Sequence, residues 1–234
     1  MTSTMRKFVA ARLSPEGAFG LHLTAGVLLL VLAAAVFADI AEDVVTADRI
    51  TVLDLQVAQW FHAHATPAVT RAMLFITNWH DTLGVSVMAL LLAAWLHVTR
   101  ARHWLLAVIV SVPGGMLLNV LLKYTFQRTR PFFHDPLVTL STYSFPSGHT
   151  AGATLFYGVL ASYLCVVHRS WRVRAAVLAG ACAMVALVGL SRIYLGAHFL
   201  SDVLAAMAEG VTWLAICITS ISTLRRRHAV RPEQ

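Results

Sequence analysis

Three polar clusters in this sequence contain residues that carry charge or exchange protons. The clusters are Lys123 with Arg130-Pro131, then Pro146-Ser147-Gly148-His149, and finally Ser191-Arg192 with His198 and Asp202. Each lies beside a long apolar run, where an ionisable group is costly unless it has a partner or a task. The residue types in these clusters therefore indicate chemistry.

The third cluster places a histidine and a carboxylate at helical spacing. His198 and Asp202 are four residues apart, so they share one face if the segment is helical. A carboxylate that accepts a hydrogen bond from one imidazole nitrogen orients the ring and leaves the other nitrogen free to attack an electrophile. The alternative interpretation is a buried His–Asp pair that only ties helices together.

Cations dominate the first cluster. Lys123 is a compact positive charge, and the planar guanidinium of Arg130 suits pairs of phosphate oxygens. Arg192 of the third cluster adds another cation. The alternative is that these cations end a membrane span and reach to its interface. We interpret Arg128, which lies between Lys123 and Arg130, as a simple interfacial anchor, with a role in selecting the head group of a ligand as the alternative.

The second cluster predicts the start of a helix. Ser147 can cap that helix, Gly148 lets the backbone approach a ligand, and free backbone N–H groups there bind anions. His149 is placed to donate a proton to a leaving group. The alternative is an ordinary cap with an interfacial histidine. Other histidines are interpreted as interfacial and without an identifiable partner: His62, His64, His80 and His134.

Together the clusters describe a site for phosphoryl transfer. Cations neutralise the phosphate oxygens, His198 attacks phosphorus and His149 protonates the leaving oxygen. The sequence shows no group of carboxylates of the kind that Mg²⁺ needs, so the cations are expected to replace a metal. No close Cys/His spacing suggests zinc. We expect neither a metal nor another cofactor.

The elements that must position these residues are membrane spans. Of the 234 residues, 58% are hydrophobic and 12% are charged, against about 25% charged residues in soluble domains. This composition excludes a soluble globule, a disordered chain and a disulfide scaffold. Six runs are long enough to cross ~30 Å of hydrocarbon: approximately Phe19–Ala38, Leu83–Val98, Trp104–Leu122, Thr150–Val167, Val173–Leu190 and Leu200–Ile221. The second run is the shortest, and a start near Met73 is its alternative boundary.

Charge predicts the orientation of these spans. With both termini in the cytoplasm, the N-terminus, the loops after the second and fourth spans and the C-terminal tail hold 12 of the 18 basic residues. Only Glu16 and Glu233 among the 11 acidic residues fall on that side. The positive-inside rule therefore favours both ends inside, which puts the three clusters on the outer face. This orientation explains the net charge of +7 without a nucleic-acid partner.

The segment from about residue 39 to 82 is too polar to span as a whole. Its apolar positions, divided by Pro67, predict two short amphipathic helices at the outer interface; a partly ordered loop is the alternative. The first apolar run is interpreted as an uncleaved helix, with a cleaved signal peptide as the alternative. We therefore expect an all-α, polytopic protein with a single membrane-embedded domain over residues 1–234 and its motif region at 123–202.

The three clusters resemble the signature of the type 2 phosphatidic acid phosphatase superfamily. That signature is K-x6-R-P, then P-S-G-H, then S-R-x5-H-x3-D, and this sequence matches every defined position in the same order. The resemblance implies a metal-independent phosphatase of lipid phosphates. It implies that His198 is the nucleophile, that Asp202 orients it and that His149 is the general acid. The implied phosphate-binding residues are Lys123, Arg130, Ser147, Gly148 and Arg192.

Three functional hypotheses follow from these observations. The first is a phosphatase of lipid phosphates or diphosphates of the undecaprenyl diphosphate, phosphatidate or phosphatidylglycerophosphate class, multi-pass in a bacterial-type inner membrane with its active site facing the periplasm. The second is a phosphotransferase that passes the phosphoryl group to another lipid or sugar. The third is a non-catalytic lipid-phosphate binder or transporter. The expected partners are the substrate and membrane lipids, and no sequence feature indicates an oligomeric state.

Overall fold

The computed structural model describes Arg12 and residues 20–230. Residues 20–230 contain helices and no strand, which confirms the prediction of an all-α fold. The predicted first residue of the first span, Phe19, lies outside the described residues, as do five charged residues used for the orientation: Arg6, Lys7, Glu16, Arg231 and Glu233. The helices are α2 (Leu21–Thr46), α3 (Arg49–Ala63), α4 (Pro67–Trp79), α5 (Thr82–Val98), α6 (Arg102–Phe126), α7 (Gly148–Val167), α8 (Trp171–Tyr194) and α9 (Leu200–Val230).

Five of these helices, α2 and α6 to α9, are long and apolar enough to cross a membrane. The remaining predicted span, the second of the six, corresponds to α5, which has only 17 residues. It reaches span length together with α4, from which it is bent by 52°. Asp81 sits at this bend and caps α5, because its Oδ1 accepts a hydrogen bond of 2.7 Å from Gly84 N. Helix α5 begins next to the predicted start at Leu83, and the alternative start near Met73 lies within α4.

The first span is longer than predicted. It continues past Ala38 to Thr46 and ends at Ala47, whose left-handed backbone (φ 57°) stops the helix. Ile40 and Ala41 lie in this extension and pack with Phe145 in a buried cluster. The apolar contact keeps the extension helical although it carries Asp39, Glu42 and Asp43, whose charges made the sequence look too polar for a span.

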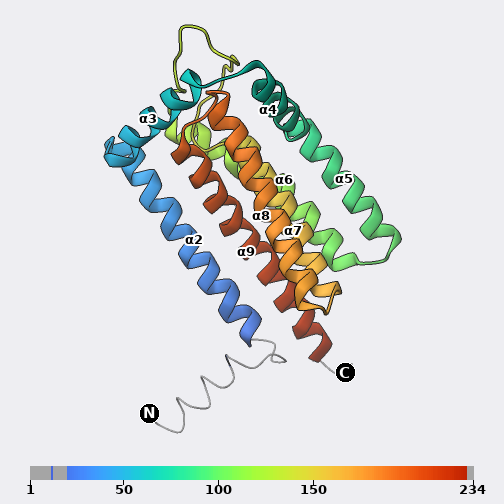
Figure 1. Ribbon diagram of the computed structural model, residues 1–234. Helices are drawn as coiled ribbons and strands as arrows, with labels where there is room; N and C mark the ends of the chain where they lie inside the picture. The colour runs from blue at the N-terminus through green and yellow to red at the C-terminus, as the bar shows by residue number, and fades with distance from the viewer. Residues whose placement is uncertain (1–11, 13–19, 231–234) are drawn as a thin grey trace.

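Helices α3 and α4 are the two short helices expected between residues 39 and 82. Asp48 occupies the N-cap of α3, and Pro67 is the first residue of α4, where its missing N–H costs nothing. One side of α3 exposes Val52, Leu55 and Trp60, whereas Asp54 is completely buried on the opposite side. The two helices lie across one end of the bundle, away from the start of α2 and the end of α9 (Figure 1).

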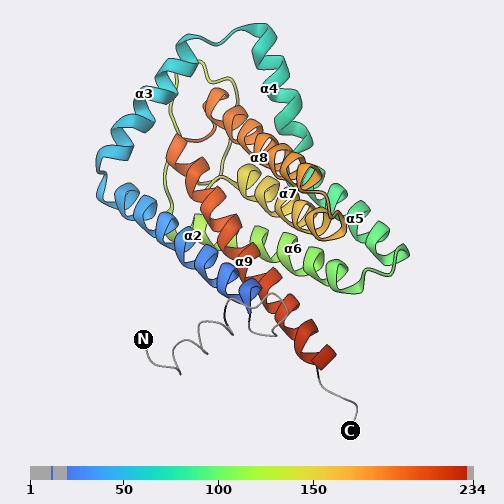
Figure 2. The same ribbon diagram turned by 60° about the horizontal axis from the view of Figure 1, so that its bottom comes forward.

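Helix α7 lies in the middle of the bundle and contacts α5, α6, α8 and α9, as Figure 2 shows. Such close packing needs small residues where helices meet. At Gly210 of α9, an added Cβ would lie 2.7 Å from a side-chain carbon of Thr154 on α7. Helix α2 packs along the outer side of α9 (Figure 2). The central position of α7 brings its first turn next to the ends of α6 and α8.

Candidate active site

The three sequence clusters meet in one cavity of about 390 Å³. The last turn of α6, the first turn of α7 and the last turn of α8, which supply several of its lining residues, lie toward the end of the bundle that carries α3, α4 and the long loop 127–147 (Figure 1). Six of the eight predicted site residues line this cavity: Lys123, Arg130, Gly148, His149, Arg192 and His198. The other two, Ser147 and Asp202, are fully buried and do not line it.

Helix ends position the charged groups around the cavity. Lys123 and Arg192 lie in the last turns of α6 and α8, where the helix dipole favours a cation. Gly148 and His149 are the first two residues of α7, where N–H groups without intrahelical partners attract an anion. The ends of three helices thus place cations and backbone N–H donors around the same cavity.

The link between α8 and α9 presents His198 to the cavity. Gly196 turns the chain with φ +65°, a conformation that favours glycine, and an added Cβ would lie 2.8 Å from the ring of Phe133. His198 follows this turn, two residues before α9 begins. Its Nε2 lies 3.2 Å from Arg130 Nη1 at the cavity, while its Nδ1 is directed toward Asp202.

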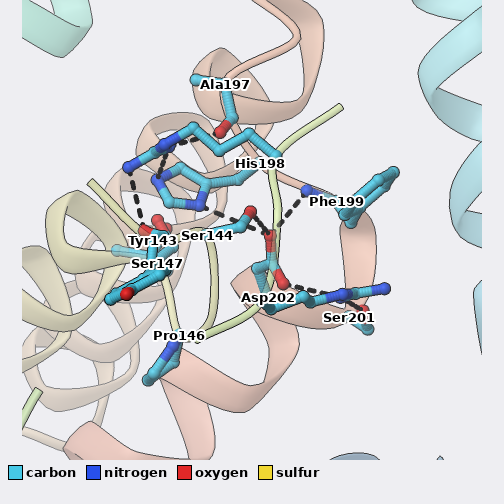
Figure 3. A network of polar contacts seen from close by, with 12 residues as sticks. Tyr143, Ser144, Pro146, Ser147, Ala197, His198, Phe199, Ser201 and Asp202 are labelled. Carbon is cyan, nitrogen blue, oxygen red and sulfur yellow. Dashed lines mark hydrogen bonds and ion pairs between the residues drawn. The ribbon is translucent and has the colours of Figure 1, made fainter. Parts of the chain in front are cut away.

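Asp202 is held by several donors besides the histidine. Its Oδ2 lies 3.5 Å from His198 Nδ1, too far for a normal hydrogen bond. The same oxygen accepts a hydrogen bond of 2.9 Å from Phe199 N and a short one from Ser144 Oγ (Figure 3). The predicted pairing of His198 with Asp202 is therefore present as a close approach, and the tighter bonds of Asp202 go to the surrounding loops.

The His198 imidazole is neutral in this environment. Burial lowers its pKa from 6.5 to about 3, and the cations Arg130 and Arg192 act in the same direction, whereas Asp202 opposes them. At neutral pH the ring therefore carries one proton and keeps a lone pair on its other nitrogen. With the proton on Nδ1, which faces Asp202, the free lone pair lies on Nε2, which faces the cavity.

Backbone carbonyls hold two of the cations in place. Lys123 Nζ donates to Pro146 O at 2.7 Å and to Tyr143 O at 3.0 Å. Arg130 donates to Thr142 O at 2.7 Å, Ala197 O at 2.5 Å and Tyr143 O at 3.1 Å. Burial also lowers the pKa of Arg130, and Asp202 opposes that shift. These bonds fix the charges before a ligand arrives, which favours electrostatic stabilisation of a bound anion.

Arg192 is the cation with spare donor capacity. It is buried, its Nη1 donates to Thr77 Oγ1, and its Nε has no hydrogen-bond partner among the described residues. A buried donor without a partner is costly. An anion in the cavity would satisfy this donor, which makes Arg192 Nε a candidate anion-binding group. Thr77 of α4 was not identified from the sequence, because the two residues are 115 positions apart.

The start of α7 differs in one detail from the prediction. Ser147 occupies the N-cap position, but its side chain does not cap the helix. Instead its Oγ accepts a hydrogen bond of 3.0 Å from Thr150 Oγ1. The first N–H groups of α7 are thereby left without a side-chain cap beside Gly148 and His149. Among the described residues, no three His, Cys, Asp or Glu side chains lie together in a way that would hold a metal ion.

Arg128 is not an interfacial anchor, so the interpretation from the sequence was wrong. Its side chain is only 13% exposed and bridges two buried carboxylates. Nη1 donates to Asp202 Oδ1 at 2.6 Å, and Nη2 donates to Asp54 Oδ2 at 2.8 Å. Asp54 also accepts a hydrogen bond of 2.9 Å from Ser201 N at the start of α9. An arginine thus joins helix α3 to the carboxylate beside His198.

Three histidines interpreted as interfacial also have partners, and one of these contacts is local, because His64 Nδ1 lies 2.8 Å from Trp60 O at the end of α3. His80 is buried, and its Nε2 lies 2.8 Å from Tyr157 Oη of α7. His62 Nε2 lies 3.1 Å from Asp135 Oδ1, and its ring stacks on Phe133. What distinguishes His80 and Asp54 is that each is a polar residue on the buried side of a short helix. The sequence does not reveal this, because it does not show which side of the helix is buried.

The comparisons with known proteins agree with this geometry. The family model of the PAP2 superfamily matches residues 104–226. Phosphatidylglycerophosphatase B of Bacillus subtilis (strain 168) is 43% identical over 99 residues, which cover 41% of this chain and 47% of that protein, so the match spans about half the length of this relative. Undecaprenyl-diphosphatase BcrC of the same organism is 30% identical over 156 residues, covering 64% of this chain and 73% of that protein.

Two crystal structures share the fold. The transmembrane PAP2 type phosphatidylglycerolphosphate phosphatase from Bacillus subtilis superposes with a TM-score of 0.69 at 26% identity, covering 89% of this chain and 98% of that one. LpxE of Aquifex aeolicus gives a TM-score of 0.57 at 23% identity, covering 71% and 94%, and shows likeness of fold alone. The segment that the family model matches contains all three motifs and every residue that lines the cavity except Thr82. This multi-pass membrane protein therefore belongs to the PAP2 superfamily.

Proposed function

We propose that this protein is an integral membrane phosphatase that hydrolyses a lipid phosphate or diphosphate through a phosphohistidine, without a metal or other cofactor. The observation that carries the proposal is a single cavity lined by two imidazoles, three cations and the N-terminus of α7. The names of the relatives support the reaction class, because both describe phosphatases of lipid phosphates.

The first step transfers the phosphoryl group to the enzyme. Lys123, Arg130 and Arg192 neutralise the phosphate oxygens, together with the N–H groups at the start of α7. The Nε2 lone pair of His198 attacks phosphorus, and the bond from phosphorus to the lipid oxygen breaks. His149 gives its proton to that oxygen, so the dephosphorylated lipid leaves as an alcohol or, from a diphosphate, as a monophosphate.

The second step returns the enzyme to its starting state. His149, now without its proton, accepts a proton from water, and the water oxygen attacks the phosphorus of the phosphohistidine. The phosphorus–nitrogen bond breaks and releases inorganic phosphate, while Nε2 of His198 recovers its lone pair. Asp202 keeps the ring oriented and stabilises the positive charge that the ring carries while it is phosphorylated.

An apolar cavity suits the lipid part of the substrate. A space of about 360 Å³ between α5 and α6 is lined almost entirely by apolar side chains, among them Leu90, Val112 and Met116. Met116 also lines the polar cavity, so the two spaces are neighbours. A lipid phosphate can place its head group among the cations while its chain stays in the apolar environment. Undecaprenyl diphosphate, phosphatidate and phosphatidylglycerophosphate are the candidate classes.

The distribution of charge supports an outward-facing site in a bacterial-type inner membrane. Described basic residues gather where α2 begins and α9 ends, and at the helix connections of that same end: Arg12, Arg100, Arg102, Arg169, Arg172, Arg174 and Arg225 to Arg227 (Figure 1). The positive-inside rule assigns this end to the cytoplasm. The cavity lies at the opposite end and would face the periplasm.

Labelling of introduced cysteines tests this orientation. In a variant whose Cys165, Cys182 and Cys217 are replaced by serine, we expect a membrane-impermeant maleimide to label Thr142→Cys from the outside. Under the same conditions Arg169→Cys should react only after the inner membrane is opened, because it lies at the opposite end of the bundle. The reverse pattern of labelling would place the site in the cytoplasm.

Removal of divalent metals is expected to leave the activity unchanged. Protein cations take the place that a metal would have beside the phosphate, so EDTA should not slow phosphate release by purified, detergent-solubilised protein. The measurement is inorganic phosphate released from polyprenyl diphosphate, phosphatidate and phosphatidylglycerophosphate, each with and without EDTA.

Three outcomes of this assay contradict parts of the proposal. Loss of activity in EDTA would contradict the metal-free mechanism. Absence of release from every lipid phosphate would support a binder or transporter. Appearance of the phosphate on a second labelled lipid, with little free phosphate, would support a phosphotransferase.

A further inference from the structure

A buried polar pair outside the three motifs lies beside the cavity. Asn119 of α6 is 3% exposed and precedes Lys123 by one helical turn, while Glu209 of α9 is 4% exposed and follows Asp202 by two turns. Asn119 Nδ2 donates a hydrogen bond of 2.8 Å to Glu209 Oε2. The pair joins residues 90 positions apart. A carboxyl group within a membrane-spanning helix is expensive and indicates a function.

Glu209 decides which end of the Asn119 amide faces the cavity. Glu209 Oε2 accepts the hydrogen bond in this contact, so it faces the NH₂ end of the amide. The carbonyl end, Oδ1, is then turned away from Glu209. Oδ1 lies against the start of α7, because an added Cβ at Gly148 would be 3.3 Å from it. No hydrogen bond to Oδ1 occurs among the described residues, and Asn119 lines the cavity.

This carbonyl is out of place in a site built only for phosphate. The charged groups around the cavity, Lys123, Arg130 and Arg192, are hydrogen-bond donors, as are the N–H groups at the start of α7. A carbonyl oxygen repels an ionised phosphate oxygen and attracts a hydroxyl. Its neighbour Gly148 directly precedes His149, the proton donor to the leaving oxygen. A leaving group held beside the start of α7 would therefore have this acceptor within reach.

We propose that Asn119 Oδ1 accepts a hydrogen bond from a hydroxyl on the lipid head group next to the scissile phosphate. The favoured substrates are then phosphate esters of a polyol head group, such as a lipid-linked glycerol phosphate, rather than lipid phosphates that lack a neighbouring hydroxyl. Glu209 acts as the positioning residue that holds the amide in this orientation. The inference rests on the proposed phosphatase function, because it assigns the leaving group of that reaction.

A matched pair of substrates tests this assignment. Phosphatidylglycerophosphate is compared with an analogue whose head-group glycerol is replaced by 1,3-propanediol, so that only the hydroxyl is missing. We expect the wild type to have a kcat/KM about tenfold higher for the glycerol substrate, because one hydrogen bond to a buried acceptor changes kcat/KM by about this factor. In Asn119→Leu the preference should fall to about one, because kcat/KM drops for the glycerol substrate alone.

A second variant and a control keep the test independent of folding. Glu209→Gln keeps Asn119 but allows its side-chain amide to rotate by about 180°, so the preference for the glycerol substrate should also fall. This variant decides the matter if Asn119→Leu does not fold. Ser111→Ala removes another buried polar group of α6 that does not line the cavity, and it should keep the wild-type preference.

Several results would overturn the assignment. One is a wild-type ratio of kcat/KM, glycerol substrate over analogue, near one, and another is an unchanged ratio in the variants. A third is an equal loss of kcat/KM on both substrates, which would show that Asn119 acts on the phosphate. In each of these cases phosphate release by the wild type would leave the proposed phosphatase function intact. If the wild type released no phosphate from either lipid, both the proposed function and the assignment of Asn119 would fail.

Discussion

Replacement of His198 by alanine is expected to abolish phosphate release, lowering kcat by roughly four orders of magnitude or more. The physical reason is that His198 is the nucleophile of the proposed reaction and no neighbouring group can replace it. Its Nε2 faces the cavity beside Arg130, and its pKa of about 3 keeps the lone pair available at neutral pH. The measurement is phosphate release from a lipid phosphate that the wild type hydrolyses.

Trapping of the intermediate makes this test specific. Wild-type protein mixed with a ³²P-labelled substrate and quenched in alkali should carry label on histidine, whereas His198→Ala should carry none. His80→Gln is the matched control, because His80 is also buried but lies outside the cavity and contacts Tyr157. A His198→Ala protein that keeps a tenth of the wild-type rate would contradict the assignment of the nucleophile.

Replacement of Arg128 by glutamine is expected to lower kcat by about 10²- to 10³-fold with little change in KM. Arg128 does not line the cavity, so it should not contribute to substrate binding. It bonds Asp202 Oδ1, and Asp202 in turn faces His198 Nδ1. Without the guanidinium the carboxylate can turn away from the histidine, and loss of the corresponding carboxylate, which leaves the histidine in the wrong tautomer, costs about 10⁴ in the serine-protease triad. Steady-state kinetics on the solubilised variant separate kcat from KM.

The same substitution should also destabilise the protein. It leaves Asp54 and Asp202 buried without their shared cation, and breaking a buried ion pair costs about 3–5 kcal/mol. Asp54→Asn is the milder test, because Arg128 keeps its bond to Asp202, and a smaller loss of kcat is expected. Arg71→Gln replaces an exposed arginine of α4 and should be silent. Wild-type kcat in folded Arg128→Gln protein would show that Arg128 is only structural.

Local spacing determined the core of the site from the sequence alone. His198 and Asp202 were expected to lie together because they are four residues apart, and the structure places Nδ1 of the histidine 3.5 Å from Oδ2 of the carboxylate, although His198 lies in the link before α9 and only Asp202 is helical. Lys123 and Arg192 were expected near span ends, and they lie in the last turns of α6 and α8. Such features depend on a few neighbouring residues and on helix geometry, which do not change with the packing of distant segments.

Boundaries were less predictable where charge and burial compete. Hydropathy ended the first span at Ala38 because acidic residues follow, yet contacts of Ile40 and Ala41 with Phe145 extend α2 to Thr46. Hydropathy likewise showed α5 as a short span, whereas its bend with α4 is a property of packing and of the Asp81 cap. Hydropathy averaged over a window of the sequence gives every charged residue the same weight, whether its side chain faces water, lipid or a partner.

The sequence by itself determined the residue types of the site, their order along the chain and the all-helical, membrane-spanning fold. Only the tertiary structure decided the partners of these residues, because those partners come from far along the chain. Arg128 meets Asp54 across 74 residues, Arg192 meets Thr77 across 115, and Asn119 meets Glu209 across 90. Helix packing sets which buried polar groups face each other, and no local pattern in the sequence contains that information.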